Sequence, residues 1–183
     1  MKIKKIIFYI VLCFSLFGFM LSACSNVSTI QQDRHFKITG NDIKGFYDYY
    51  IFDNFGNVVY TGHTEGKEPD ISYTSREILE IRLHGGTYAD ICKYYNTLTN
   101  KFSEEYENPF LVEDGLIVYY NADSKKLIAR DLFDEKVFYK DFSREISIVL
   151  APEYVEFKDN NSRLEIRYFK NADDIISETL NLK

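Results

Sequence analysis

The sequence predicts an all-β domain, an antiparallel meander of short strands that follows an N-terminal signal helix. Apolar residues alternate with polar ones at Leu79, Ile81 and Leu83 and again at Leu164 and Ile166, and such alternation is typical of half-buried strands. Polar turns rich in Asn and Asp separate the alternating segments, as hairpin loops require. No ten-residue window after residue 35 has the 3.6-residue period of a helix.

The first 23 residues have the composition of a secretory signal. Lys2, Lys4 and Lys5 precede sixteen uncharged residues, 6–21. A basic start, an apolar run and small residues before a cleavage point are typical of a signal peptide. The alternative is an uncleaved transmembrane anchor, but sixteen residues fall short of the roughly 20 that a spanning helix needs.

The tetrad Leu21-Ser22-Ala23-Cys24 resembles the lipobox of bacterial lipoproteins. The resemblance implies that the Cys24 thiol receives a diacylglycerol and that the chain is cut in front of it. Two acyl chains give stable membrane attachment. We therefore expect a lipoprotein signal peptide at 1–23, the lipidated Cys24 with a tether over 24–34, and an all-β domain at 35–183. The expected location is the extracytoplasmic face of the cell membrane.

Charge and cysteine content exclude several classes of partner. Removing the three signal lysines changes the formal net charge from −6 to −9, which argues against nucleic acid as a ligand. Cys13 leaves with the signal and Cys24 carries lipid, so Cys92 would be the one free thiol. A single cysteine forms neither an internal disulfide nor a metal site, and we expect no cofactor.

The expected strands fall into units of four on a period near 40 residues. Such units are typical of propeller blades, and a β-sandwich or barrel of the same strands is the alternative. The first unit lacks one strand. The expected strands are 35–39, 46–53, 58–63, 71–74, 78–84, 89–96, 101–107, 110–113, 116–121, 126–133, 136–142, 146–150, 154–158, 163–169 and 175–182.

Two segments carry a second resemblance. Residues 94–109, which include Lys101-Phe102-Ser103-Glu104-Glu105-Tyr106, and residues 130–140 resemble β domains of uncharacterised secreted proteins and lipoproteins from Gram-positive bacteria. This resemblance implies no activity and no catalytic residues.

The sequence contains no recognisable catalytic constellation. His35, His63 and His84 are not spaced as paired ligands, and no Gly-x-Ser-x-Gly elbow or phosphate-binding glycine loop occurs. Acidic residues are plentiful but scattered. The sequence therefore predicts no enzyme, no catalytic residues and no bound metal.

Tyrosines supply the candidate binding face. A ring on each side of a strand puts one ring in the core and can expose the other, and exposed tyrosines are good contact residues. The alternative is that neighbouring sheets cover both faces. The candidate residues are Tyr47, Tyr49, Tyr50, Tyr95 and Tyr119.

These observations predict a membrane-anchored lipoprotein that acts as a non-catalytic binding module for another envelope protein or a wall polymer. A carboxylate-dependent hydrolase of wall glycan or peptide is one alternative. An accessory or immunity-type lipoprotein that inhibits a secreted partner is another.

Overall fold

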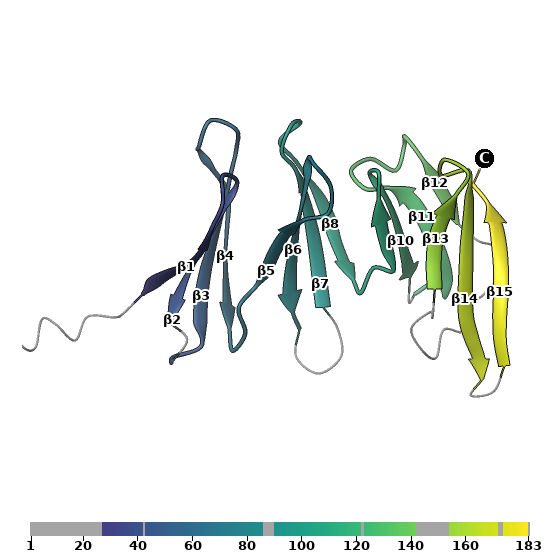
Figure 1. Ribbon diagram of the computed structural model, residues 1–183, viewed down its shortest axis with the longest axis horizontal. Coiled ribbons are helices and arrows are strands. Elements are labelled where there is room, and N and C mark those ends of the chain that lie inside the picture. Colours follow the sequence, from purple (N-terminus) through teal and green to yellow (C-terminus); the bar gives the residue numbers. More distant parts are fainter. Residues whose placement is uncertain are drawn as a thin grey trace, which may run out of the picture.

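A computed structural model describes residues 27–41, 43–85, 90–121, 123–141, 154–171 and 174–182. Four antiparallel sheets stand face to face in a row (Figure 1). We name them sheets A to D in chain order. The described part of the chain contains no helix with the length and apolar character needed to cross a membrane.

Each sheet is made of consecutive strands, so the fold follows the sequence order. Sheet A contains β1 (Ser28–Gln32), β2 (Phe36–Asn41), β3 (Phe46–Phe52) and β4 (Val58–Glu65). Sheet B contains β5 (Asp70–Tyr73), β6 (Ile78–His84), β7 (Asp90–Asn96) and β8 (Lys101–Glu107). Sheet C contains β9 (Leu111–Glu113), β10 (Leu116–Asn121), β11 (Lys126–Asp131) and β12 (Tyr139–Asp141). Sheet D contains β13 (Tyr154–Lys158), β14 (Arg163–Asn171) and β15 (Asp174–Asn181).

The all-β class, the antiparallel meander and the repeated four-stranded unit are therefore confirmed. Sheet D has three strands in the described part, and the fourth expected strand, 146–150, lies outside the described residues. The expected signal helix and Cys24 lie outside them as well.

The first unit corrects the expected tether. Residues 28–32, expected as part of the tether, form β1 and pair with β2, so sheet A has all four strands. Alternation did not reveal this strand because Ile30 is its one large apolar residue. The Ile30 side chain packs against the core that sheets A and B share.

Three apolar cores hold the four sheets together, one in each gap. The strand alternation that defines a buried face explains each core, because every second side chain points to the same neighbour. The core between sheets A and B contains Phe36, Ile38, Tyr47, Tyr49, Ile51, Ile71, Leu79, Ile81 and Tyr95. The core between sheets B and C contains Ile78, Cys92, Tyr94, Tyr106, Ile117 and Leu132. The core between sheets C and D contains Val118, Leu127, Ala129, Phe157, Leu164, Ile166 and Leu182.

The stack is open at both ends. Within the described residues β1 pairs with β2 and β15 pairs with β14, and no pairing joins sheet A to sheet D. Figure 1 shows these two sheets at opposite ends of the row. The blade-like units thus form a linear stack rather than a closed propeller or barrel.

Candidate functional site

Three turns at one end of the strands each expose a large apolar side chain. Phe55 is 87% exposed, Leu98 63% and Val137 71%. They lie in the connections β3–β4, β7–β8 and β11–β12, which join the third and fourth strands of sheets A, B and C and project at the same end of the molecule (Figure 1). A single exposed apolar residue is normal on a protein surface. An exposed apolar residue in the same connection of three successive sheets indicates a common role. We call these residues the turn-tip row.

The first turn is fixed by the Asp53 carboxylate. Its Oδ1 accepts hydrogen bonds from the backbone N–H groups of Phe55 and Asn57, both at 2.8 Å, and its Oδ2 accepts from Asn57 Nδ2 at 2.9 Å. Gly56 takes the left-handed conformation, with φ of 83°, which a glycine adopts without strain. The hydrogen bonds from Asn57 hold the pKa of Asp53 below its ordinary value, so the carboxylate stays ionised and the turn stays closed.

The second turn is fixed in a similar way. Asn96 Oδ1 accepts hydrogen bonds from the N–H groups of Leu98 and Thr99 at 3.0 and 2.9 Å. The Tyr95 hydroxyl donates to Asn100 Oδ1 at 2.7 Å. Leu98 is therefore held outward by its own backbone, as Phe55 is.

Asn54 connects these two turns, and buried His35 holds it in place. His35 Nε2 lies 3.0 Å from Asn54 Oδ1, and Asn54 Nδ2 donates to the Thr97 carbonyl at 2.6 Å. Because the amide nitrogen of Asn54 faces Thr97, its oxygen accepts, and His35 Nε2 is the donor. The Tyr73 hydroxyl oxygen lies 2.5 Å from His35 Nδ1 and 3.1 Å from Asp33 Oδ1. The network spans sheets A and B and fixes the spacing of the first two tips.

The third turn relies on two aspartates. Asp131 Oδ1 accepts hydrogen bonds from the N–H groups of Phe133 and Asp134 at 2.9 and 2.8 Å. The Val137 N–H donates to the Asp134 carbonyl at 3.0 Å. This turn occupies residues that the sequence assigned to the strands 126–133 and 136–142, so β11 ends at Asp131 and β12 begins at Tyr139.

A charged cluster lies between sheets B and C. Arg82 Nε donates to Glu80 Oε1 at 2.8 Å, Arg82 Nη1 lies 3.5 Å from Asp90 Oδ2, and His84 Nδ1 lies 2.9 Å from Asp90 Oδ1. His84 and then Arg82 hold the pKa of Asp90 below its ordinary value. A glycosidase pair needs one protonated carboxylic acid, whereas both acids here are paired with Arg82. This geometry favours an ion-pair network that supports the packing of the sheets.

The free thiol next to this cluster is chemically inert. Cys92 is fully buried, and burial raises the pKa of its thiol to about 11. The thiolate is the nucleophile in cysteine chemistry, so Cys92 is a core residue, as small apolar cysteines usually are.

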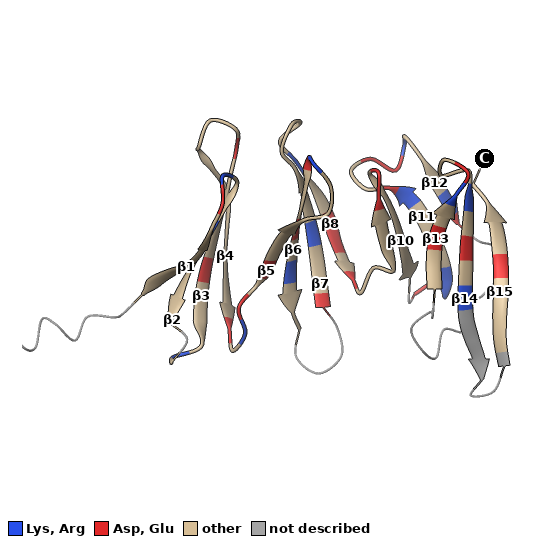
Figure 2. Ribbon diagram, in the orientation of Figure 1, with Lys and Arg blue, Asp and Glu red and all other residues tan. Residues whose placement is uncertain are grey.

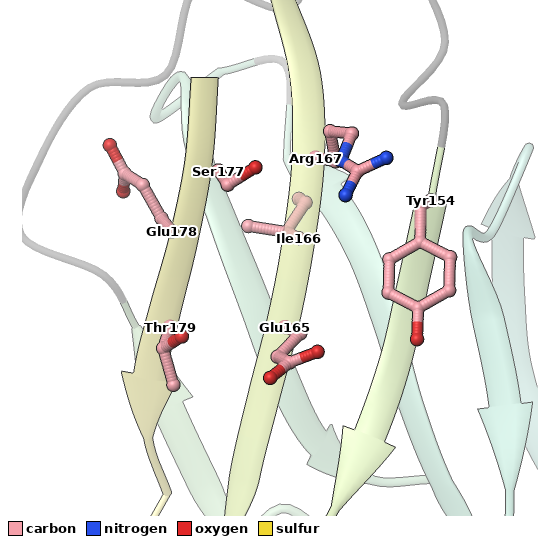
Figure 3. A pocket seen from close by; sticks show the side chains of 7 residues that line it. All are labelled: Tyr154, Glu165, Ile166, Arg167, Ser177, Glu178 and Thr179. Carbon is pink, nitrogen blue, oxygen red and sulfur yellow. The ribbon is translucent and has the colours of Figure 1, made fainter. Parts of the chain in front are cut away.

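A shallow pocket lies on sheet D, at the far end of the stack (Figure 3). Its volume of about 170 Å³ is below the roughly 300 Å³ at which small-molecule sites begin. The strands that surround it carry alternating charges (Figure 2), which gives this end a polar surface. The lining residues are Tyr154, Glu165, Ile166, Arg167, Ser177, Glu178 and Thr179.

The structure does not gather the five tyrosines of the expected binding face. Tyr47, Tyr49 and Tyr95 are buried in the core between sheets A and B, and Tyr119 packs against the core between sheets B and C. Tyr50 is half-buried on the outer face of sheet A. Both faces of sheet B are covered by neighbouring sheets, and this is why the rings are not free. The expected face is therefore not exposed at Tyr47, Tyr49 and Tyr95.

The turn-tip row was missed by the sequence analysis, although a signal exists. Phe55 lies within Asp53-Asn54-Phe55-Gly56-Asn57, and Leu98 lies within the similarly polar segment 96–100. A large apolar residue at the centre of a polar turn has no core to enter, so its position alone indicates exposure.

The fold and this surface together define an open stack of β-meander sheets with a row of exposed apolar turn tips. The chain matches no protein-family model, no curated protein and no solved structure.

Proposed function

We propose that this protein is a non-catalytic interaction module, held at the extracytoplasmic face of the cell membrane by lipid on Cys24. The turn-tip row is the surface that binds its partner, another protein of the envelope. The observation that carries the proposal is the repetition of one exposed apolar side chain on three successive sheets.

The rigidity of the tips supports a role in binding. Phe55 and Leu98 sit on turns that are closed by side-chain hydrogen bonds and joined by the hydrogen bond from Asn54 to Thr97. Little conformational entropy is therefore lost when a partner covers them. Full burial of a Phe or Leu side chain contributes about 1.5–3 kcal/mol. Two such tips can therefore provide a large part of the free energy of a micromolar complex, which is about 8 kcal/mol.

The state of the nucleophilic and acidic groups supports the absence of catalysis. The Cys92 thiol is buried with a raised pKa, and Glu80 and Asp90 are both ion-paired with Arg82. Neither arrangement offers an activated nucleophile or a carboxylic acid ready to donate a proton.

Site-specific photocrosslinking in living cells tests the proposal. A benzophenone amino acid replaces Phe55 in one variant and Leu98 in another, with Tyr154 on sheet D as the control position. Tyr154 is also an exposed ring, at 37%, but lies at the other end of the stack. We expect the same partner protein to be crosslinked from positions 55 and 98 and not from 154. Crosslinking from all three positions alike, or from 154 alone, contradicts the proposal.

A loss-of-binding variant provides the second arm. Phe55→Ser combined with Leu98→Ser should reduce capture of that partner at least about tenfold, since hot-spot residues each contribute about 2 kcal/mol or more. The matched control is Ile175→Ser, which removes a 47% exposed apolar side chain from sheet D and should leave capture unchanged.

A further inference from the structure

The opposite end of sheet A carries a second exposed apolar tip, and it lies next to the start of β1. Ser28 pairs with Gly40 near the end of β2, which places the beginning of the sheet beside the β2–β3 turn. Three residues lie between Cys24 and Ser28, and an extended chain spans at most about 14 Å over these four residue steps. Any attachment of residue 24 to a bilayer therefore holds the start of β1 and the neighbouring β2–β3 turn close to the bilayer surface.

The β2–β3 turn presents its tip outward. Asn41 closes it: the Asn41 carbonyl accepts hydrogen bonds from the N–H groups of Lys44 and Gly45 at 3.1 and 2.8 Å, and Asn41 Oδ1 accepts from the same Lys44 N–H at 3.1 Å. Ile43 is 96% exposed, and Val27 is 45% exposed. Both are large apolar side chains on the part of the domain nearest the anchor.

Lysines flank this tip. The Gly66 N–H donates to the Gly45 carbonyl at 2.6 Å, which joins the β4–β5 connection to the β2–β3 turn. Lys44 and Lys67 are both exposed. We call Val27, Ile43, Lys44 and Lys67 the anchor-side corner.

We propose that the anchor-side corner rests in the headgroup region of the lipid bilayer, with Ile43 entering the boundary of the acyl chains. The inference rests on the proposed anchoring in front of residue 27 and adds a protein–lipid contact to it. Apolar tips flanked by lysines suit this layer, because the apolar part enters about 5–10 Å while the ammonium groups stay in water. The short attachment keeps the corner at high effective concentration beside the bilayer, which favours lipid over a diffusing partner.

Charge at the corner indicates which lipids are needed. Glu65 ends the strand before Lys67, Glu68 follows Lys67, and Asp42 precedes Ile43 in the sequence, so the corner carries no excess of positive charge. The contact should therefore form on zwitterionic phosphatidylcholine and gain little from anionic lipid.

This contact also sets the orientation of the domain. The seven residues of β3 extend over about 23 Å between the turn that carries Ile43 and the turn that carries Phe55. With Ile43 in the bilayer, the turn-tip row points away from the membrane, where a partner can reach it.

Single-tryptophan fluorescence tests the inference directly, because the chain contains no Trp. The full chain is produced with its own N-terminus, purified, and reconstituted into phosphatidylcholine vesicles with ordinary or brominated acyl chains. Ile43→Trp is the reporter, and Phe55→Trp, at the opposite end of the same sheet, is the matched control. Both positions are almost fully exposed, so neither change should disturb the fold, which circular dichroism verifies.

We expect brominated lipid to reduce the Ile43→Trp emission about twofold or more, as insertion to the acyl boundary implies, and to leave the Phe55→Trp emission unchanged. Adding Ile43→Asp to a Val27→Trp reporter should weaken its quenching. An unquenched Ile43→Trp overturns the inference, and so does equal quenching of both tryptophans, which would mean that the domain lies flat. The mass of the N-terminal peptide from the same preparation separately reports whether Cys24 carries lipid. A lipid-free Cys24 would refute the proposed lipoprotein. The quenching would still test whether the anchor-side corner contacts lipid, because an uncleaved apolar segment at 6–21 would hold the same end of sheet A at the bilayer.

Discussion

Gly62 lies where the core between sheets A and B leaves no room for a side chain, so Gly62→Ala should destabilise the protein severely. A Cβ atom at Gly62 would lie 2.1 Å from Cζ of Tyr49, 2.2 Å from its hydroxyl oxygen and 2.4 Å from its Cε1. Carbon atoms in contact prefer about 3.5–4.0 Å, so the ring has to move by more than about 1 Å. Tyr49 is 2% exposed and packs near Tyr60, so the surrounding core resists this movement.

The expected cost follows from that geometry. Overpacking a core usually costs about 1–3 kcal/mol and sometimes more, and contacts this short place Gly62→Ala at the upper limit or beyond, about 3 kcal/mol. With a urea m value of about 1–3 kcal/mol/M, the midpoint of urea unfolding should fall by at least about 1 M. Far-UV circular dichroism of the purified chain measures it.

Two further variants separate this clash from the general cost of losing a glycine. Gly56→Ala meets nothing within 4 Å but keeps a φ of 83°, so it should cost only the left-handed strain of about 1–2 kcal/mol. Tyr49→Leu removes the ring, so the Gly62→Ala substitution should cost at least about 1 kcal/mol less in that background. The reasoning is refuted if Gly62→Ala costs no more than Gly56→Ala, or if Tyr49→Leu brings no relief.

His35→Phe removes the hydrogen bond to Asn54 in a buried network, and urea unfolding should show a loss of about 1–3 kcal/mol. His63 is exposed, and its hydrogen bond to Asp48 raises its pKa. NMR titration should therefore give a His63 pKa above the ordinary value of about 6.5. The Asp48→Asn substitution should lower the His63 pKa. Because this pKa is raised, the pair stabilises the fold fully below the pKa of an unfolded histidine, and the contribution is lost as pH rises through the folded value. The Cys92 thiol, with its pKa raised to about 11 by burial, should react with an aromatic disulfide reagent only after unfolding in urea.

Three measurements would contradict these predictions. Unchanged stability of His35→Phe would mean that the two turns do not depend on the network. A His63 pKa at or below the ordinary value would remove the role assigned to Asp48. Reaction of Cys92 in the native protein would contradict its place in the core.

The strands could be predicted because their signals are local. Alternation at Leu79, Ile81 and Leu83 and the turn residues between segments depend only on neighbouring residues, and these segments became β6 and its hairpins. β1 was missed because it is an edge strand whose residues are mostly polar and show no apolar alternation. Its pairing with β2 therefore leaves no signal in its own sequence. The open stack was also not predictable, since the same blade-like units can close into a ring.

The candidate site depended on information that alternation lacks. A tyrosine on each face of a strand does not reveal whether a second sheet covers that face, and here sheets cover Tyr95 and Tyr119. The exposure of Phe55 and Leu98, in contrast, follows from turn chemistry close in sequence. The sequence therefore carried a signal for the exposure of the turn tips, whereas the burial of the tyrosines depended on how the sheets stack.

The linear order of the sheets affects how the chain can fold while it emerges from its N-terminus onward. In a closed propeller the ring must wait for the last blade to meet the first, so a long-range contact comes at the end. Here each sheet is made of consecutive strands and packs on the sheet before it. For a chain that emerges N-terminus first, sheet A can form and then serve as the template on which sheet B settles, as in other arrays with nearest-neighbour contacts. The N-terminal end of the stack would thus be in place before the last sheet has emerged.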